Sequence, residues 1–84
     1  MRTNEEINHF IGFCEIIGDD FAVRIISLFS HRSKKTLEKF REKLNKSLKE
    51  KTSCLLDEFN LLIGDQIQVA LNILDWLENV WDKI

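Results

Sequence analysis

Apolar residues recur at intervals of three and four along most of the chain, which is the spacing of an amphipathic helix. The chain contains no proline, no Asn-Gly or Asp-Gly pair and no sustained alternation of apolar and polar residues, so the usual signs of strands are missing. Two short polar stretches, 31–33 and 51–53, each hold a serine or threonine that can cap a following helix. The pattern predicts an all-α fold, a small antiparallel bundle of three principal helices at about 4–30, 33–51 and 53–83.

The first predicted helix begins with a capping-box spacing, in which Thr3 and Glu6 can each satisfy a free amide at the helix start. Its apolar residues fall within one half of the helical wheel on both sides of Gly18. A helix that stopped and restarted there would have no reason to keep this register, so one bent helix is favoured over two shorter ones. Gly18 lies in the apolar half, where the missing side chain would let another backbone approach.

The last predicted helix also has an apolar and a polar half, with Gly64 on the polar half. The pattern leaves open whether each outer helix is continuous or is bent or broken at its glycine. The two segments share the pattern F-x3-I-G-D-x3-V-x4-L at an offset of 46 residues, which aligns Gly18 with Gly64. A duplicated element and convergence of two amphipathic helices both explain this likeness. We favour convergence, because the two glycines fall on opposite faces.

The middle segment, 31–51, is basic although the whole chain has a net charge of −2. It holds nine Lys or Arg residues and three Glu, a net +6, so the rest of the chain carries −8. Its apolar stripe is only about 80° wide. Five lysines share the opposite face: Lys35, Lys39, Lys43, Lys46 and Lys49. We favour a solvated face that complements the acidic outer helices, with an acidic protein surface or a nucleic acid as alternative partners. Glu42 and Glu50 on the same face argue against nucleic acid.

The composition, 44% hydrophobic and 31% charged, is that of one globular domain over residues 1–84. The longest apolar run is three residues and no basic and apolar leader opens the chain, so we expect a cytoplasmic protein without a membrane partner. Cys14 and Cys54 are expected to be buried free thiols. His9 lies about 140° from Cys14 on a helix, so the two cannot share a metal ion. The sequence holds no motif for a metal, a cofactor or a small-molecule substrate.

Arg24 and His31, in the segment R-I-I-S-L-F-S-H, fit the R-x4-6-H pattern of HEPN ribonucleases, which this chain resembles in being small and helical. In that family, whose members are commonly dimeric, the arginine and histidine meet their dimer mates and activate the ribose 2′-hydroxyl. A seven-residue spacing would put both side chains on one helix face. The resemblance covers eight residues, and Ile25 stands where the family usually has a polar residue. We favour an ion pair of Arg24 with Asp20 and a His31 that caps or flanks a turn.

A bundle of this size without a ligand motif offers mainly its surface, so we expect macromolecular binding as an adaptor, inhibitor or regulatory subunit rather than catalysis. The apolar faces of the outer helices are wider than the middle helix can cover, which predicts a homodimer through them. Gln66, a polar residue in the apolar half of the last helix, is expected at such an interface. Contacts with another protein are expected at the C-terminal turns, where tryptophan is a frequent hot spot. These residues are Trp76, Val80, Trp81 and Ile84, and the favoured alternative is that the two tryptophans only close the end of the bundle.

Two other functions remain open on the sequence. One is a dimeric ribonuclease that uses Arg24 and His31 as its catalytic pair. The other is a nucleic-acid-binding protein that uses the lysine face of the middle helix. Loss of RNA cleavage in a His31→Ala variant would support the first, and steeply salt-dependent binding would support the second.

Overall fold

The structure, a computed structural model of the chain, describes the backbone of residues 4–80 and the side chains of residues 8–79. The predicted capping box of Thr3 and Glu6 lies outside these side chains. The described residues form four helices and one two-stranded antiparallel sheet. In chain order the elements are α1 (Asn4–Ile17), α2 (Asp19–Phe29), α3 (Lys34–Glu50), β1 (Cys54–Asp57), β2 (Asn60–Leu62) and α4 (Asp65–Val80).

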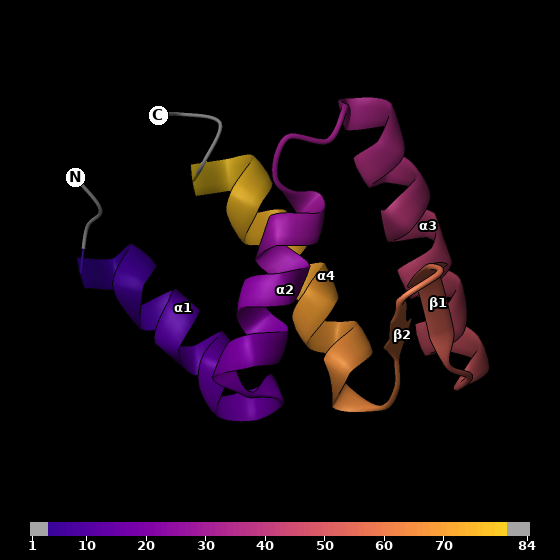
Figure 1. Cartoon of the computed structure of the whole chain (residues 1–84), viewed down its shortest axis with the longest axis horizontal. Helices are drawn as coiled ribbons and strands as arrows, with labels where there is room; N and C mark the ends of the chain where they lie inside the picture. Colours follow the sequence, from indigo (N-terminus) through magenta and orange to yellow (C-terminus); the bar gives the residue numbers. More distant parts are fainter. Residues whose placement is uncertain (1–3, 81–84) are drawn as a thin grey trace.

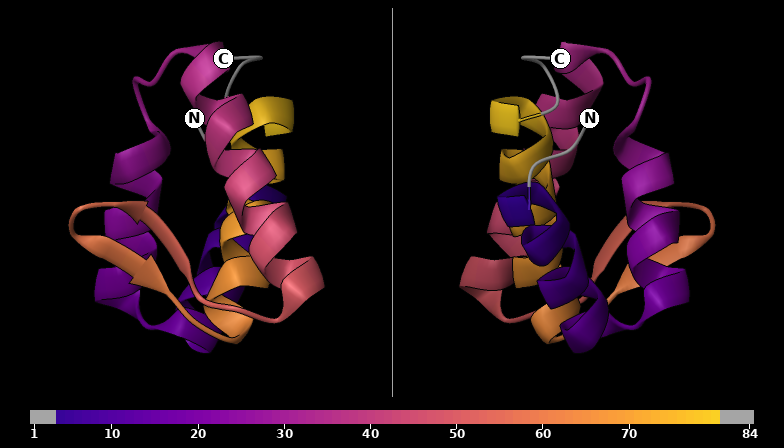
Figure 2. Two further views of the ribbon diagram at one scale, coloured as in Figure 1. Left: turned by 90° about the vertical axis from the view of Figure 1, so that its right-hand side faces the viewer. Right: turned by 90° about the vertical axis from the view of Figure 1, so that its left-hand side faces the viewer.

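The helices alternate in direction, so that each one runs opposite to the helix before it (Figures 1 and 2). Helices α1 and α2 diverge from Gly18 in a V, and α4 packs against both α1 and α3. The hairpin of β1 and β2 lies beside α3, and its turn projects away from the helices (Figure 2). The predicted antiparallel packing of helices is therefore present, together with a hairpin that the prediction lacked.

Residues 54–62 form this hairpin where the sequence predicted the start of a helix over 53–83. The side chain of Asp57 determines the turn, because its Oδ1 accepts hydrogen bonds from the backbone amides of Phe59 and Asn60 at 2.8 and 2.9 Å. Those two amides would otherwise donate to carbonyls of a helix. The described chain is therefore mostly helical, as predicted, but it has four helices and a hairpin in place of three helices alone, and the last helix is confined to α4.

Gly18 and Gly64 each stand directly before a helix and have left-handed backbone, with φ of +89° and +55°. The single bent helix over 4–30 is therefore wrong, since the chain breaks at Gly18 and α2 folds back along α1. A Cβ built on Gly18 would meet no atom within 4 Å, so the position needs glycine for its φ and not for the close approach of another backbone.

The shared Ile-Gly-Asp segments mark the same local event, a helix that starts after a left-handed glycine. Asp19 and Asp65 are the first residues of α2 and α4, where a carboxylate interacts favourably with the helix dipole. The rest of the shared pattern has no structural counterpart. Phe13 lies in α1, whereas Phe59 lies in the hairpin turn. A duplicated helical element therefore does not explain the likeness.

Helix α3 follows the sequence prediction closely. Ser33 is its N-cap, and the Oγ atom accepts a hydrogen bond from the Thr36 amide at 3.2 Å. Phe40 and Leu44 of the predicted apolar stripe are buried. The helix ends at Lys51, whose φ is +58°. The cap predicted within 51–53 for a following helix is wrong, because strand β1 follows.

The core lies between α2, α3, α4 and the inner side of the hairpin. Its largest fully buried side chains are Ile25, Phe29, Leu44, Leu62, Ile73 and Leu74. Cys54 is buried and Cys14 is half-buried, and both are free thiols, as expected. Burial, together with the neighbouring Asp19 carboxylate, raises the pKa of the Cys14 thiol.

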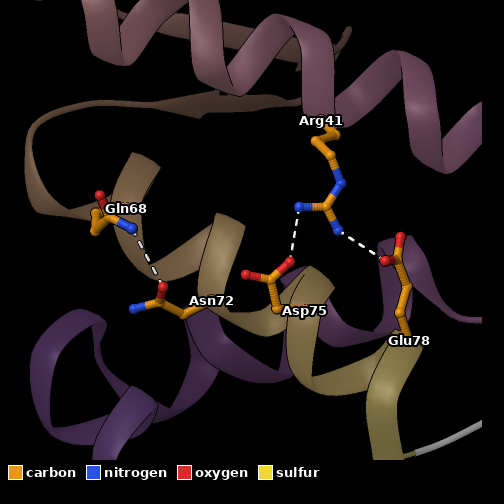
Figure 3. A network of polar contacts seen from close by, with 5 residues as sticks. All are labelled: Arg41, Gln68, Asn72, Asp75 and Glu78. Carbon is orange, nitrogen blue, oxygen red and sulfur yellow. Dashed lines mark hydrogen bonds and ion pairs between the residues drawn. The ribbon is translucent and has the colours of Figure 1, made fainter.

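Arg41 joins α3 to α4 at the edge of this core (Figure 3). One guanidinium nitrogen lies 2.7 Å from Oδ1 of Asp75 and the other lies 3.0 Å from Oε2 of Glu78. Burial opposes the charge of the guanidinium, yet these two hydrogen-bonded carboxylates raise the pKa of Arg41. The two ion pairs therefore fix the register between α3 and α4. They also neutralise the charge of Arg41, one of the basic residues of α3.

The glycine at the start of α2 gives a test of this backbone account. Gly18→Ala should lower the free energy of unfolding by about 1–3 kcal/mol, because its φ and ψ lie in a region that is nearly restricted to glycine. The matched control is Gly12→Ala inside α1, where a Cβ meets nothing within 4 Å. That change should raise stability by about 0.5–1 kcal/mol. Urea denaturation measures both, and equal effects of the two substitutions would contradict the account.

Candidate functional site

The hairpin carries four large apolar side chains on the side that faces away from the core. We call this side the outer face; it consists of Leu55, Phe59, Leu61 and Ile63, which are 56%, 84%, 53% and 60% exposed. The opposite side of the same segment packs into the core through Cys54, Leu56, Asn60 and Leu62. The outer face is the largest group of exposed apolar residues that neighbour one another in sequence within the described side chains.

Strand geometry explains why these residues are exposed. Successive side chains of a strand point to opposite faces, so within β2 Leu61 is exposed while Asn60 and Leu62 point inward. Phe59 precedes the strand in the turn and Ile63 follows it, and both are exposed. Leu55 pairs directly with Leu61 across the antiparallel ladder. The same alternation in β1 points Leu56 inward, and the register shifts between Leu55 and Asp57 at the end of the strand.

The turn presents Phe59 because Asp57 holds it rigidly. Besides the two backbone amides, Asp57 Oδ1 accepts a hydrogen bond from Nδ2 of Asn60 at 2.8 Å. The Phe59 amide is the main cause that lowers the pKa of the Asp57 carboxyl, and the donors of Asn60 add to it. Phe59 is therefore held on an ordered turn, with the exposed Glu58 beside it.

A hollow of about 370 Å³ lies at the other end of the hairpin, where its strands join α3 and α4. We call it the root hollow; Leu48, Ile63 and Ile67 line it, and Lys51 is also part of its wall. Leu48 is itself 41% exposed. Ile63 belongs to both features, so the outer face continues into the root hollow.

The lysine row of α3 borders the hairpin. Lys35, Lys39, Lys43, Lys46 and Lys49 are all exposed, as expected. Nζ of Lys43 donates to the carbonyl oxygen of Leu56 at 3.5 Å, which places it over β1. Within the described side chains, none of the five makes an ion pair with a carboxylate.

The structure describes only part of the partner site that was predicted at the end of the last helix. Trp76 is buried, and its ring packs edge to face on Phe13 of α1 with 5.8 Å between the ring centroids. This contact uses Trp76 to join α4 to α1, and its role in partner binding stays a prediction. The side chain of Val80, and all of Trp81 and Ile84, lie outside the described residues.

Gln66 also has a different role from the one expected. Its Oε1 accepts a hydrogen bond from the backbone amide of Ile63 at 2.9 Å. This is the return bond of a helix N-terminal cap, which links β2 to the start of α4. Gln66 is therefore an intrachain structural residue, and its side-chain carbonyl is already used inside the chain.

The structure does not bring Arg24 and His31 onto one helix face. Helix α2 ends at Phe29, and His31 follows it in the turn with φ of +63°. The Arg24 guanidinium lies 4.8 Å from the centroid of the Phe21 ring, and within the described residues it forms no ion pair with Asp20. The one-face geometry expected for the ribonuclease pattern is therefore absent from a single chain.

No group of three or more His, Cys, Asp or Glu side chains within residues 8–79 is placed to hold a metal ion. Among the described helices, none has both the length and the apolar character needed to cross a membrane.

The chain matches no protein family model, no curated protein and no solved structure. The functional argument therefore depends on the geometry described above.

The turn at Asp57 gives a pH-dependent test. Asp57→Ala should lower the free energy of unfolding at pH 7 by about 1 kcal/mol, because three donors lose their acceptor. The folded-state pKa of Asp57 is lowered, so its contribution is present above the unfolded pKa of about 3.9 and is lost as the pH falls through the folded value. The difference between wild type and variant should therefore shrink below about pH 4. Glu58→Ala, which removes none of these bonds, is the control in urea titrations at both pH values.

Proposed function

We propose that this chain is a protein–protein interaction module that binds through the outer face of its hairpin. One observation carries the proposal: four large apolar side chains are more than half exposed on one side of a two-stranded sheet. Apolar patches of this kind on small proteins are characteristic of binding surfaces. In this proposal the chain acts as an adaptor, inhibitor or regulatory subunit and has no catalytic role, and it binds itself, another protein or both.

The energetics of the outer face support binding to another macromolecule. Transfer of apolar surface out of water contributes about 25 cal/mol per Å². The Asp57 hydrogen bonds order the turn before any partner arrives, so little conformational entropy remains to be lost there. Phe59 is the most exposed of the large apolar residues and projects from this turn, a position suited to insertion into a partner.

The location of the patch also favours a protein as the partner. A two-stranded sheet has an outer edge on each strand, and exposed edges are sites where another chain can add. At the edge of β1 the Leu56 carbonyl oxygen already accepts a hydrogen bond from Nζ of Lys43. The partner would thus meet an apolar surface with lysines of α3 at one border, which favours a protein that presents apolar residues next to acidic ones.

Photo-crosslinking tests this proposal directly. The photoreactive residue p-benzoylphenylalanine replaces Phe59 in one variant and Val23 of α2, also about half exposed, in the control variant. Irradiation in the natural host cell should give protein adducts from position 59 and few from position 23, and mass spectrometry identifies each adduct. Equal labelling at the two positions, or no adduct from position 59, would show that the outer face is not a protein-binding surface.

A second candidate function, binding of a nucleic acid, rests on the lysine row. The row is exposed along α3 and is not neutralised by ion pairs among the described side chains. Lysines three or four residues apart on a helix repeat about every 5–6 Å and can follow a phosphate backbone. Glu42 and Glu50 are exposed on the same helix and weaken this surface for polyanions.

A salt titration separates this candidate from the first. If the lysine row binds nucleic acid, affinity for a duplex should fall steeply with salt, and Lys39→Gln together with Lys46→Gln should reduce the slope of log K against log salt by about 1.8. Phe59→Ala should leave the duplex affinity unchanged. Absence of measurable binding at about 50 mM salt would remove the candidate.

A further inference from the structure

We propose that the outer face is occupied by the outer face of a second copy of this chain, so that the two hairpins stack in opposite directions around a two-fold axis. This inference rests on the proposed function, because it names the partner of the same surface. It follows from a self-complementary feature of the hairpin: its turn carries a projecting aromatic ring and its other end carries a hollow.

The spacing along β2 suits a two-fold axis at Leu61. Phe59 and Ile63 flank strand β2, each two residues from Leu61 on opposite sides of it, and all three side chains are more than half exposed. The two-fold axis would lie between the two stacked faces, perpendicular to the strands and level with Leu61. Rotation about this axis places Phe59 of one copy above Ile63 of the other. At about 3.3 Å per residue, each lies about 7 Å from the axis.

The root hollow lies at the position that this operation gives to Phe59. Ile63 lines the hollow together with Leu48 and Ile67, and the space is about 370 Å³. The Phe59 ring of each copy would enter the root hollow of the other, so both rings and both hollows are used at once. A two-fold interface of this kind closes after two copies and leaves no unmatched surface that would extend into a filament.

Charge is complementary under the same operation. The turn carries Asp57, whose charge the nearby Arg32 partly offsets, and Glu58, whereas residues 46–51, next to the root hollow, carry three lysines and one glutamate. Asp65 at the start of α4 offsets one of these positive charges, so residues 46–51 and Asp65 together carry a net charge of +1. Glu58 is exposed beside Phe59, and Lys51 belongs to the hollow wall, so stacking in opposite directions brings these two charges together. Stacking in the same direction would instead place turn against turn and repel.

The size of the surface predicts a weak dimer. Four partly exposed side chains, each with at most about 200 Å² of surface, fall short of the roughly 800 Å² that each partner buries in a standard interface. The walls of the root hollow and the stems of the nearby lysines add to the contact. We therefore expect dissociation constants of about 1–100 μM.

A charge-exchange experiment tests the arrangement. Glu58→Lys and Lys51→Glu should each weaken the dimer about tenfold or more in sedimentation equilibrium, because each variant creates two like-charge contacts per dimer. A 1:1 mixture of the two single variants should regain the wild-type affinity. In a dimer of unlike chains, the two introduced charges, which are opposite in sign, meet at one contact, and the native Glu58 and Lys51 meet at the other.

An apolar pair of variants and a folding check complete this experiment. Phe59→Ala should weaken the dimer about tenfold, because it removes the ring that enters the root hollow. The control Val23→Ala, at an exposed apolar residue of α2 outside the outer face, should leave the dimer unchanged. Circular dichroism establishes that each variant is folded.

Each outcome decides the inference. Wild-type mass near twice 9.9 kDa, with rescue only in the mixture, is the expected result. A wild-type chain that remains at 9.9 kDa up to about 500 μM, beyond the range expected for a small interface, would overturn it. A dimer that is indifferent to all these substitutions would also overturn it, since that dimer would use another surface. In both cases the proposed function stands if position 59 crosslinks to a different protein more than position 23 does, and fails if position 59 gives no protein adduct or labels no more than position 23.

Discussion

The left-handed backbone at Gly64 and the Asp57 turn together decide how the second half of this chain is folded. They keep residues 54–62 in a hairpin and delay the last helix until Asp65. The change matters because side chains repeat every 3.6 residues in a helix and every two in a strand. Apolar residues that a helix would gather on one buried side are divided between two faces of the hairpin. Leu62 enters the core, whereas Leu61 and Ile63 remain exposed.

The available surface follows from the same division. A shorter last helix is covered on several sides by its neighbours, and Trp76 is used in packing against α1. The hairpin therefore carries four of the exposed large apolar side chains among the described residues, while Trp76 is buried. The Arg41 contacts with Asp75 and Glu78 hold α3 beside α4, which turns the lysine row outward and places Lys43 beside β1. The binding surface that we propose thus depends on both the hairpin and the helix register.

The sequence predicts α3 well because its signals are local. Ser33 caps the helix, and the spacing of Phe40 and Leu44 places both in the core, as in an ordinary amphipathic helix. The break at Gly18 is only one of two interpretations that the pattern allows, because the apolar residues keep the same helical register on both sides of it. The positive φ of Gly18 cannot be read from that pattern. The hairpin cannot be predicted in the same way. Strand β2 has three residues, too few to show a period of two, and its register depends on packing against the rest of the fold.

One signal for the candidate site is present in the sequence. Asp57 and Asn60 have the spacing of a turn in which an aspartate accepts amide hydrogen bonds. Hydroxyl-radical footprinting of Phe59 against protein concentration tests most directly whether the outer face is covered by a second copy. The account predicts that oxidation of Phe59 falls as concentration rises through the micromolar range, while oxidation of Ile11 and Val23 does not change. Phe59 oxidation that is independent of concentration would contradict it.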